Sequence, residues 1–289
     1  MADYRIGALW IGGALSYLEQ LCLQSFLDAG HEVRLYTYEG VDNAPPGVEQ
    51  ADATAILPNA ETLRHSRTGS PALHSDLFRY HMLAKVEHII WADTDAYCLR
   101  KFTTESGHFH AWESETGING GVLGLPADSA TLRALLDFTS DPFAIPDWYG
   151  ADYRAELEAK ARAGSPVHAG DMRWGVWGPH ALTHYLQQTG EVRHTMPQVT
   201  LYPVPYGERN LMLRPGYDMS GMITPASYSI HFYGRRMRSR ILQQENGVPR
   251  PKCLIGMLLK KHNIDPTAAP IRPRSVADAP IVDRDGALV

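Results

Sequence analysis

The chain has few cysteines and no long apolar run. Its 289 residues include three cysteines, Cys22, Cys98 and Cys253, which lie far apart. An odd, sparse number without metal-type spacing argues against a disulfide framework and fits a reducing compartment. No apolar segment approaches the ~20 residues that span a bilayer, and the first residues are not typical of a signal peptide. We therefore expect a soluble cytoplasmic protein.

An excess of charge of one sign is also missing. The 27 Lys and Arg residues against 32 Asp and Glu residues give a formal net charge of -5, so no general attraction to nucleic acid is expected. Gly12-Gly13 lacks the remaining glycines of the G-x-G-x-x-G phosphate fingerprint. Hydrophobic residues make up 44% of the chain, enough for one large core or two small ones.

The N-terminal third has the pattern of a βαβ unit. Residues 5–11 are predicted to form a strand, and residues 31–38 a second one with β-rich composition. Between them, Leu15, Leu18, Cys22 and Phe26 form one apolar stripe at helical spacing. This helix is expected to end at Gly30, a residue suited to the position after a helix. A strand, a helix and a strand within roughly forty residues predict parallel pairing with a right-handed crossover, and hence an α/β fold.

The rest of the chain is less regular. Residues 41–60 are loop-like, and a helix is predicted from Ser70-Pro71, with Leu73, Leu77 and Tyr80 facing inward. His108 and His110 alternate on a strand-like segment and are expected to be partly exposed. Strands are predicted at residues 109–114, 121–125, 199–204 and 228–232, and helices from 128 or 129 to 138, at 152–162, from about 179, and at 253–261.

The domain prediction follows from this pattern. We expect residues 1–264 to form a single domain of the size of a catalytic domain. Residues 265–289 are rich in Pro, Arg and Asp without an apolar period, so they are predicted to be a flexible C-terminal tail.

The most informative segment is residues 88–95, which reads His-Ile-Ile-Trp-Ala-Asp-Thr-Asp. An apolar run of this length bounded by polar residues predicts a strand that is covered on both faces. Ligands of open α/β sheets gather outside the carboxyl ends of the strands. Asp93 and Asp95 at such an end would offer hard oxygen ligands to Mg²⁺ or Mn²⁺, completed by substrate phosphates. The alternative is a solvated turn.

A second charged pair precedes this strand. On the predicted helix, Asp76 and Arg79 are one turn apart on the same face. An exposed pair of this kind contributes only a few tenths of a kcal/mol. Beside the Asp93 strand a binding role is favoured, because a guanidinium matches phosphate or sugar oxygens and a carboxylate accepts sugar hydroxyls.

Two other functions are compatible with paired aspartates. Phosphatases of the haloacid-dehalogenase type also end a strand in D-x-D, with the first aspartate as nucleophile. Here ninety residues precede the motif, and Tyr97 stands where those enzymes have Thr or Val. A carbohydrate-binding module without catalytic activity is the third possibility, and it predicts sugar binding that a chelator does not change.

The two central motifs resemble a known family. The pairing of Ser75-Asp76 and Arg79-Tyr80 with Asp93-Thr94-Asp95, about fourteen residues later, resembles the DXD-motif sugar-binding glycosyltransferases. That group includes the initiation mannosyltransferase of yeast, α-1,4-galactosyltransferases, bacterial capsular polysaccharide transferases and, more distantly, the large clostridial toxins. The resemblance covers roughly residues 5–235 and is specific at these two motifs.

The resemblance implies a fold and a reaction. The expected fold is of GT-A type, a Rossmann-like, mostly parallel central sheet flanked by helices, with a mixed acceptor-side region. The expected reaction transfers a sugar from a nucleotide-sugar with retention of configuration and uses Mn²⁺ or Mg²⁺ as cofactor. A UDP-sugar is the first candidate for the donor. The acceptor would be a glycan or a lipid-linked glycan, as in polysaccharide biosynthesis. The donor sugar and the linkage stay open.

The resemblance also implies roles for individual residues. Asp95 would ligate the metal, and Asp93 would contact the ribose or reach the metal through water. Ser75, Asp76 and Arg79 would hold the donor sugar. Trp10 and Tyr38, near the ends of the first two strands, would cover the base, although core packing explains such aromatics equally well.

A late segment supplies further candidates. His231, in the run His231-Phe232-Tyr233-Gly234-Arg235-Arg236, is the predicted third metal ligand, and Arg235 or Arg236 would bind the β-phosphate. The alternative is a structural histidine followed by a solvated basic turn. The flanking lysines of residues 253–261 leave a peripheral membrane contact of the last helix open.

The acceptor side is defined only by composition. Asn119 falls where such enzymes have an acceptor-side strand, and Asp171, Trp174 and Trp177 combine a carboxylate with aromatic faces, as sugar sites do. Asp147 beside Trp148 and Tyr149 is a similar group, and Glu113 and Glu115 are further carboxylates to test near the anomeric carbon. Anchoring of loops by these aromatics is the alternative.

Overall fold

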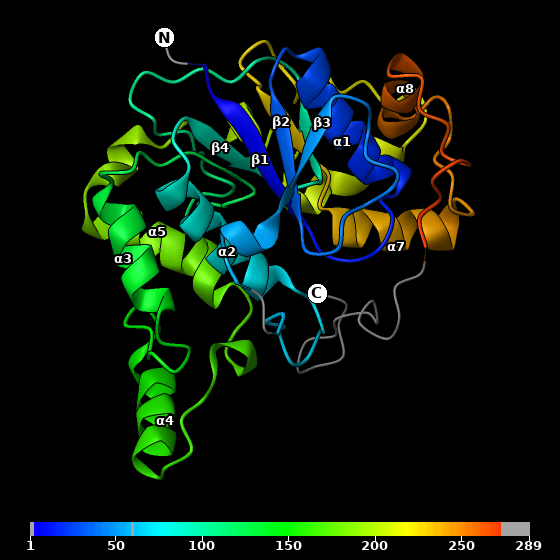
Figure 1. Ribbon diagram of the computed structural model, residues 1–289. Coiled ribbons are helices and arrows are strands. Elements are labelled where there is room, and N and C mark those ends of the chain that lie inside the picture. Colours follow the sequence, from blue (N-terminus) through cyan, green and yellow to red (C-terminus); the bar gives the residue numbers. More distant parts are fainter. Residues whose placement is uncertain (1–2, 59–60, 273–289) are drawn as a thin grey trace.

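The computed structural model describes residues 3–58 and 61–272. A five-stranded sheet forms its centre, and helices cover both faces (Figure 1). In this view α3, α4 and α5 lie on one side of the sheet, and α1, α7 and α8 on the other, with α4 extending furthest from it.

The central sheet is mostly parallel. Its order is β3-β2-β1-β4-β6, and only the pair of β4 and β6 is antiparallel. The strands are β1 (Arg5–Trp10), β2 (Val33–Thr37), β3 (Val48–Asp52), β4 (Ile89–Ala92) and β6 (Val122–Leu123). A separate antiparallel pair joins β5 (Ala96–Cys98) to β7 (Ser229–His231). The predicted α/β class with a mostly parallel sheet flanked by helices is confirmed.

The two faces of the sheet bury different side chains. On β4, Ile90 and Ala92 pack in the cluster that contains Phe26 of α1. Ile89 and Trp91 point the other way, into the cluster that contains Phe78 of α2. This alternation follows from the period of two in a strand. A strand with apolar residues on both faces is stable only under two layers of helices, which explains the continuous apolar run in the sequence.

The helices are mostly short. The main ones are α1 (Tyr17–Asp28), α2 (Ala72–Lys85), α3 (Ala130–Thr139), α4 (Ala151–Arg162), α5 (Ala181–Gln188), α6 (Gln198–Leu201), α7 (Gly234–Gln244) and α8 (Leu254–Lys261). Short 3-10 helices cover Ala53–Ala55, Ala169–Asp171, Glu191–His194 and Tyr206–Leu213, and a π-helical turn covers Val176–His180.

Most predicted elements are present, with three corrections. Residues 41–60 are not only a loop, because β3 lies there as an edge strand with mostly exposed side chains. Residues 199–204 are not a strand, because α6 occupies their first part after Pro197. Residues 109–114 make only isolated bridges at Phe109, Ala111 and Trp112.

The C-terminal part packs against the outer side of α1. Ile230 of β7, Met237 of α7 and Ile255 of α8 share one buried cluster with Tyr17 and Leu18. Residues 265–272 return to the same cluster, and Ile271 is 5% exposed. Residues 273–289, the remainder of the predicted tail, lie outside the described residues, so the domain boundary stays a prediction.

None of the helices in the described part of the chain has both the length and the apolar character needed to cross a membrane.

Candidate functional site

A pocket of about 590 Å³ opens at the carboxyl ends of β1 and β4. Its lining residues come from segments far apart in the sequence: the loop after β1, the starts of α1, α2 and α7, the turn after β4, and the pair Pro270 and Arg272. It is the position at which open α/β sheets bind their ligands. The charged residues in its lining are Glu19, Arg64, Arg79, Asp93, Asp95, Arg235, Arg238 and Arg272.

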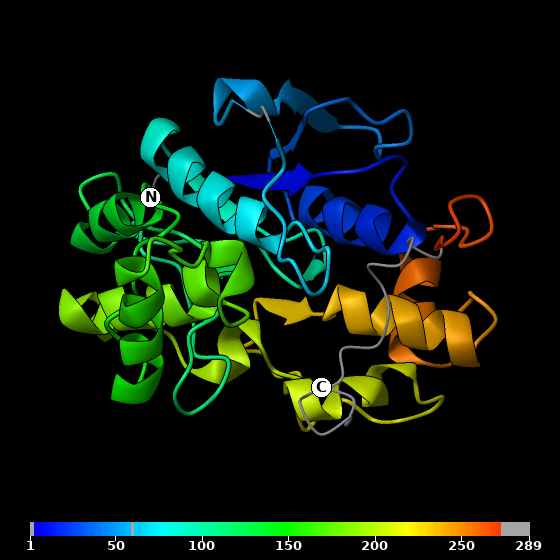
Figure 2. The same cartoon turned by 90° about the horizontal axis from the view of Figure 1, so that it is seen from below.

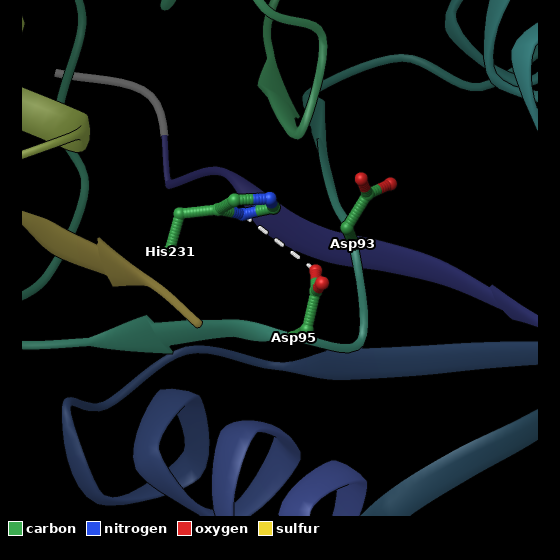
Figure 3. A group of neighbouring side chains, drawn as sticks. All are labelled: Asp93, Asp95 and His231. Atoms are coloured by element: carbon green, nitrogen blue, oxygen red, sulfur yellow. Dashed lines mark ion pairs between the residues drawn. The ribbon is translucent and has the colours of Figure 1, made fainter. Parts of the chain in front are cut away.

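Two aspartates and a histidine converge beside this pocket. One carboxylate oxygen each of Asp93 and Asp95 and one ring nitrogen of His231 lie within 4.8 Å of one another. Figure 3 shows the imidazole of His231 facing the carboxylate of Asp95 across 3.6 Å from Nδ1 to Oδ1. The β5–β7 pair produces this approach, because Ala96 is the register partner of His231.

The donor atoms of this group fit a divalent cation. Asp95 Oδ2 accepts a hydrogen bond from the backbone N–H of Gly234 at 2.6 Å, which fixes the carboxylate at the start of α7. Asp95 Oδ1 and His231 Nδ1 are both buried and have no hydrogen-bond partner among the described residues. Buried polar atoms are rarely left unpaired. Two carboxylate oxygens and one imidazole nitrogen suit Mn²⁺ or Mg²⁺.

Asp93 is held more tightly than Asp95. Its Oδ1 accepts hydrogen bonds from Trp91 Nε1 at 2.7 Å and from Arg79 Nη2 at 3.1 Å. Burial raises the pKa of Asp93, and the positive charge of Arg79 opposes this effect. The other oxygen, Oδ2, lies 3.4 Å from the place that a Cβ at Gly121 would take.

Asp76 and Arg79 are not a surface ion pair. Both are buried, and Arg79 Nη2 lies 3.3 Å from Asp76 Oδ1 and 3.1 Å from Asp93 Oδ1. The Arg79 guanidinium also lies over the Trp91 ring, 4.9 Å from its centroid. Burial raises the pKa of Asp76 to about 7, although Arg79 lowers it. One arginine thus pairs with both carboxylates and connects α2 to the end of β4.

Three glycines allow these side chains to lie where they do. A Cβ at Gly121 would lie 3.1 Å from His231 Cε1 and 3.4 Å from Asp93 Oδ2. A Cβ at Gly120 would lie 2.5 Å from Arg79 Nη1, and one at Gly178 would lie 2.8 Å from Asp76 Oδ2. The site therefore has glycine wherever backbone approaches a charged side chain.

The predicted donor residues divide into two groups. Trp10, Ser75 and Arg235 line the pocket together with Arg79 and Asp93. Asp76 and Tyr38 are not among the lining residues. The Tyr38 hydroxyl donates to the Leu57 carbonyl at 3.1 Å and bonds His74 Nε2 at 2.7 Å, and the Tyr38 ring packs edge-on against His74 of α2.

The predicted acceptor residues are less concentrated. Trp174 is 41% exposed and lines the pocket, whereas Trp177 is 2% exposed and belongs to a core cluster. A ring this buried cannot stack on a sugar. Asn119 shapes the backbone, since its Oδ1 accepts from the Gly121 N–H at 2.8 Å. Asp171 is exposed and does not line the pocket.

The remaining acceptor carboxylates are also dispersed. Glu115 is exposed, and Glu113 is half-buried at a position where its charge raises the pKa values of Tyr202 and Tyr233. Asp147 lies 3.2 Å from His184 Nε2 and does not line the pocket.

Several residues of the site carry no recognisable sequence signal. Arg64, Arg238 and Arg272 line the pocket, yet each stands in a segment that reads as solvated charge. The pair Gly120-Gly121 is a local signal, because adjacent glycines mark places where other groups approach the backbone closely. Its importance depends on which side chains fold against it.

Comparisons with known proteins give limited information. No protein-family model matches the chain, and no curated protein matches it. The solved structure of the PaToxG glycosyltransferase matches with 14% identity and a TM-score of 0.42, over 66% of this chain and 70% of that one.

Two further solved structures are more distant. Mouse xyloside xylosyltransferase 1, in its apo form, matches with 12% identity and a TM-score of 0.36, over 69% of this chain and 87% of that one. An active-site mutant of LgtC matches with 10% identity and a TM-score of 0.27, over 62% and 69%. With TM-scores this low, none of these likenesses assigns an activity to the chain.

Proposed function

We propose that this protein is a metal-dependent glycosyltransferase of GT-A type. It transfers a sugar from a nucleotide-sugar to a hydroxyl group of a glycan acceptor with retention of configuration. A UDP-sugar is the first candidate for the donor. One observation carries the proposal: two buried atoms that have no hydrogen-bond partner in residues 3–58 and 61–272, Asp95 Oδ1 and His231 Nδ1, face each other at the edge of an arginine-rich pocket.

The donor set defines the cofactor that we propose. Asp95, His231 and Asp93 Oδ2 would hold Mn²⁺ or Mg²⁺, and the cation would neutralise charge on the departing nucleoside diphosphate. The hydrogen bond from Gly234 to Asp95 Oδ2 leaves Oδ1 directed at the site. Asp95 therefore presents one oxygen in a fixed direction.

The chain supplies positive charge for the two phosphates. Five arginines line the pocket, Arg64, Arg79, Arg235, Arg238 and Arg272, against the acidic residues Glu19, Asp93 and Asp95. Such a surface attracts an anionic ligand and stabilises a leaving group that becomes more negative as the glycosidic bond breaks. In this proposal the indole of Trp10, which lines the pocket at the end of β1, packs on the base.

Arg79 orients the sugar in this proposal, and Asp76, which does not line the pocket, holds Arg79 in position. Arg79 is fixed by two carboxylates and by the Trp91 ring, so it presents its remaining donors without loss of side-chain entropy on binding. A phosphatase of the haloacid-dehalogenase type is not favoured. Its nucleophile would be Asp93, whose Oδ1 already accepts two hydrogen bonds.

The configuration can be retained without a carboxylate nucleophile if the leaving phosphate itself guides the acceptor hydroxyl. We therefore propose no nucleophile. Lipid linkage of the acceptor and membrane contact by α8 stay predictions from the sequence.

The substitution Asp95→Asn tests the proposal. It keeps an oxygen that can accept from Gly234 N–H, but it removes the negative charge. We expect the fold to persist and transfer to fall by roughly 10²–10³-fold, the cost of removing one charge-stabilising group. Melting curves with UDP, with and without Mn²⁺, measure the metal-dependent part of binding, because a ligand of the native state raises the melting temperature.

The matched control is Asp137→Asn, which makes the same change at an exposed position on α3. It should leave the Mn²⁺-dependent shift with UDP unchanged. The metal role would be contradicted if Asp95→Asn kept the Mn²⁺-dependent shift in melting temperature with UDP. It would also be contradicted if UDP raised the melting temperature of the unmodified protein in the presence of a chelator. The latter result would instead favour a binding module without a metal.

A further inference from the structure

Residues 265–272 form a wall of the pocket. A turn after α8 is closed by the Asp265 side chain, which accepts from the Thr267 N–H at 2.8 Å and from its hydroxyl at 2.7 Å. The Ala269 carbonyl then accepts from the Tyr17 N–H, the first residue of α1, at 2.7 Å. Figure 2 shows this end of the described chain beside the start of α1. The segment is therefore attached to the element that supplies Ser16 and Glu19 to the pocket.

Side chains alternate along this segment. Ala269 and Ile271 are 6% and 5% exposed, and Ile271 packs in the cluster of Tyr17 and Leu18. Pro270 and Arg272 are exposed and line the pocket. This is the alternation of an extended chain, in which neighbouring side chains point to opposite sides. Burial of Ile271 therefore determines that Arg272 is on the pocket side.

Two of the three acidic residues that line the pocket, Glu19 and Asp93, already form ion pairs with other arginines. Arg238 forms an ion pair with Glu19, whose other oxygen accepts from the Ser16 hydroxyl. Arg79 forms an ion pair with Asp93. Among residues 3–58 and 61–272, no carboxylate forms an ion pair with Arg272. Its charge is thus not neutralised by the described part of the protein.

We infer that Arg272 binds a phosphate oxygen of the nucleoside diphosphate. The inference rests on the proposed function and adds the C-terminal segment to the binding site. A guanidinium matches a phosphate bidentately, and the two ends of the segment that carry it, at Asp265 and Ile271, are fixed by hydrogen bonds and burial. Because the backbone is ordered before the ligand arrives, less entropy is lost when the contact forms.

Calorimetric titrations with UDP in the presence of Mn²⁺ test this inference. Arg272→Gln should raise the dissociation constant for UDP about tenfold, the loss expected for one charge-assisted hydrogen bond. Arg272→Lys should recover part of the affinity, because the charge remains while the bidentate geometry is lost. Titration with Mn²⁺ alone should give the same affinity in all variants, since the cation ligands are unchanged.

Arg162→Gln is the matched control. Arg162 ends α4, is 72% exposed at its side chain and pairs only with Glu158 one turn away. It should bind UDP as the unmodified protein does. If the unmodified protein does not bind UDP with Mn²⁺, the proposed function fails together with this inference. If the unmodified protein binds UDP and Arg272→Gln binds it equally well, only the role of Arg272 is overturned.

Discussion

At the scale of single residues, the candidate cation site depends on a position without a side chain. Gly121 lies between His231 and Asp93, and the Asn119 side chain fixes its backbone N–H at 2.8 Å. The His231 ring cannot move away easily, because Tyr202 and Tyr233 pack edge-on against it at 5.7 and 4.7 Å between centroids. A methyl group on Gly121 would therefore press on the side chains of His231 and Asp93.

Gly121→Ala is expected to weaken Mn²⁺ binding by at least about tenfold while the fold remains, since one displaced ligand costs on this order. Isothermal titration with Mn²⁺ and a melting curve measure the two effects separately. Gly221→Ala is the control, because a Cβ there meets nothing within 4 Å. Equal Mn²⁺ affinity in Gly121→Ala and the control would show that His231 is not a ligand.

At the scale of elements, helix starts are held by carboxylates, both local and distant. In α1 the cap is local: Ser16 and Glu19 form a capping box, and Glu19 also pairs with Arg238 of α7. In α3 a distant carboxylate adds to the cap. Glu191 accepts from the Ser129 hydroxyl at 2.6 Å and from the Ala130 N–H at 2.8 Å. Negative charge at a helix N-terminus is stabilising.

Glu191→Gln should lower the free energy of unfolding by about 1 kcal/mol at neutral pH, the typical value of a cap. Hydrogen bonds from Ser129 and Thr131 lower the pKa of Glu191 against the effect of burial. The Glu191 carboxylate therefore makes its full contribution to the free energy of unfolding above the ordinary pKa of glutamate. This contribution is lost as the pH falls through the lowered pKa that Glu191 has in the folded protein. Urea denaturation of the native protein and of Glu191→Gln measures the free energy of unfolding at pH 7 and at pH 3.

The difference in stability between the native protein and Glu191→Gln should shrink on acidification. Glu158→Gln, at an exposed i,i+4 pair on α4, serves as the control and should change stability little at either pH. A difference that is constant between the two pH values would exclude a charge-dependent cap.

At the scale of the whole molecule, one buried histidine couples folding to pH. His110 is 0% exposed, and neither of its ring nitrogens has a hydrogen-bond partner in the described part of the chain. The expectation of partial exposure is therefore wrong for this residue, whose backbone carbonyl accepts from the Met196 N–H and whose neighbours Phe109 and Ala111 form bridges to Gly124 and Met196. Burial, with the charges of His108 and His194, lowers the pKa of His110 to about 3.

The unfolded chain binds a proton at this residue near pH 6.5, and the folded chain does so only near pH 3. The free energy of unfolding should therefore fall as the pH decreases below 6.5, by up to about 1.4 kcal/mol per pH unit from this group. His110→Leu should show a smaller fall between pH 6.5 and pH 5, measured by chemical denaturation. His88→Asn, at an exposed site, should retain the slope of the native protein.

The sequence predicted what depends on local pattern. The β1–α1–β2 unit, α2, the buried strand β4 and the acidic turn after it were all predicted at nearly their observed places, because periodicity and capping act within a few residues. The pairing of Asp76 with Arg79 was also predicted, since one helical turn separates them. The candidate third ligand, His231, was predicted by analogy with a family rather than from its own neighbours.

Only the tertiary structure decided the environments of these residues. Gly234 and Asp95 are 139 residues apart in the chain, and the β5–β7 pairing brings them together. Burial of Trp177, the distance of Tyr38 from the pocket and the packing of Ile271 likewise result from non-local contacts. Local propensity cannot encode such contacts, because their stabilisation arises only after distant segments have closed on one another.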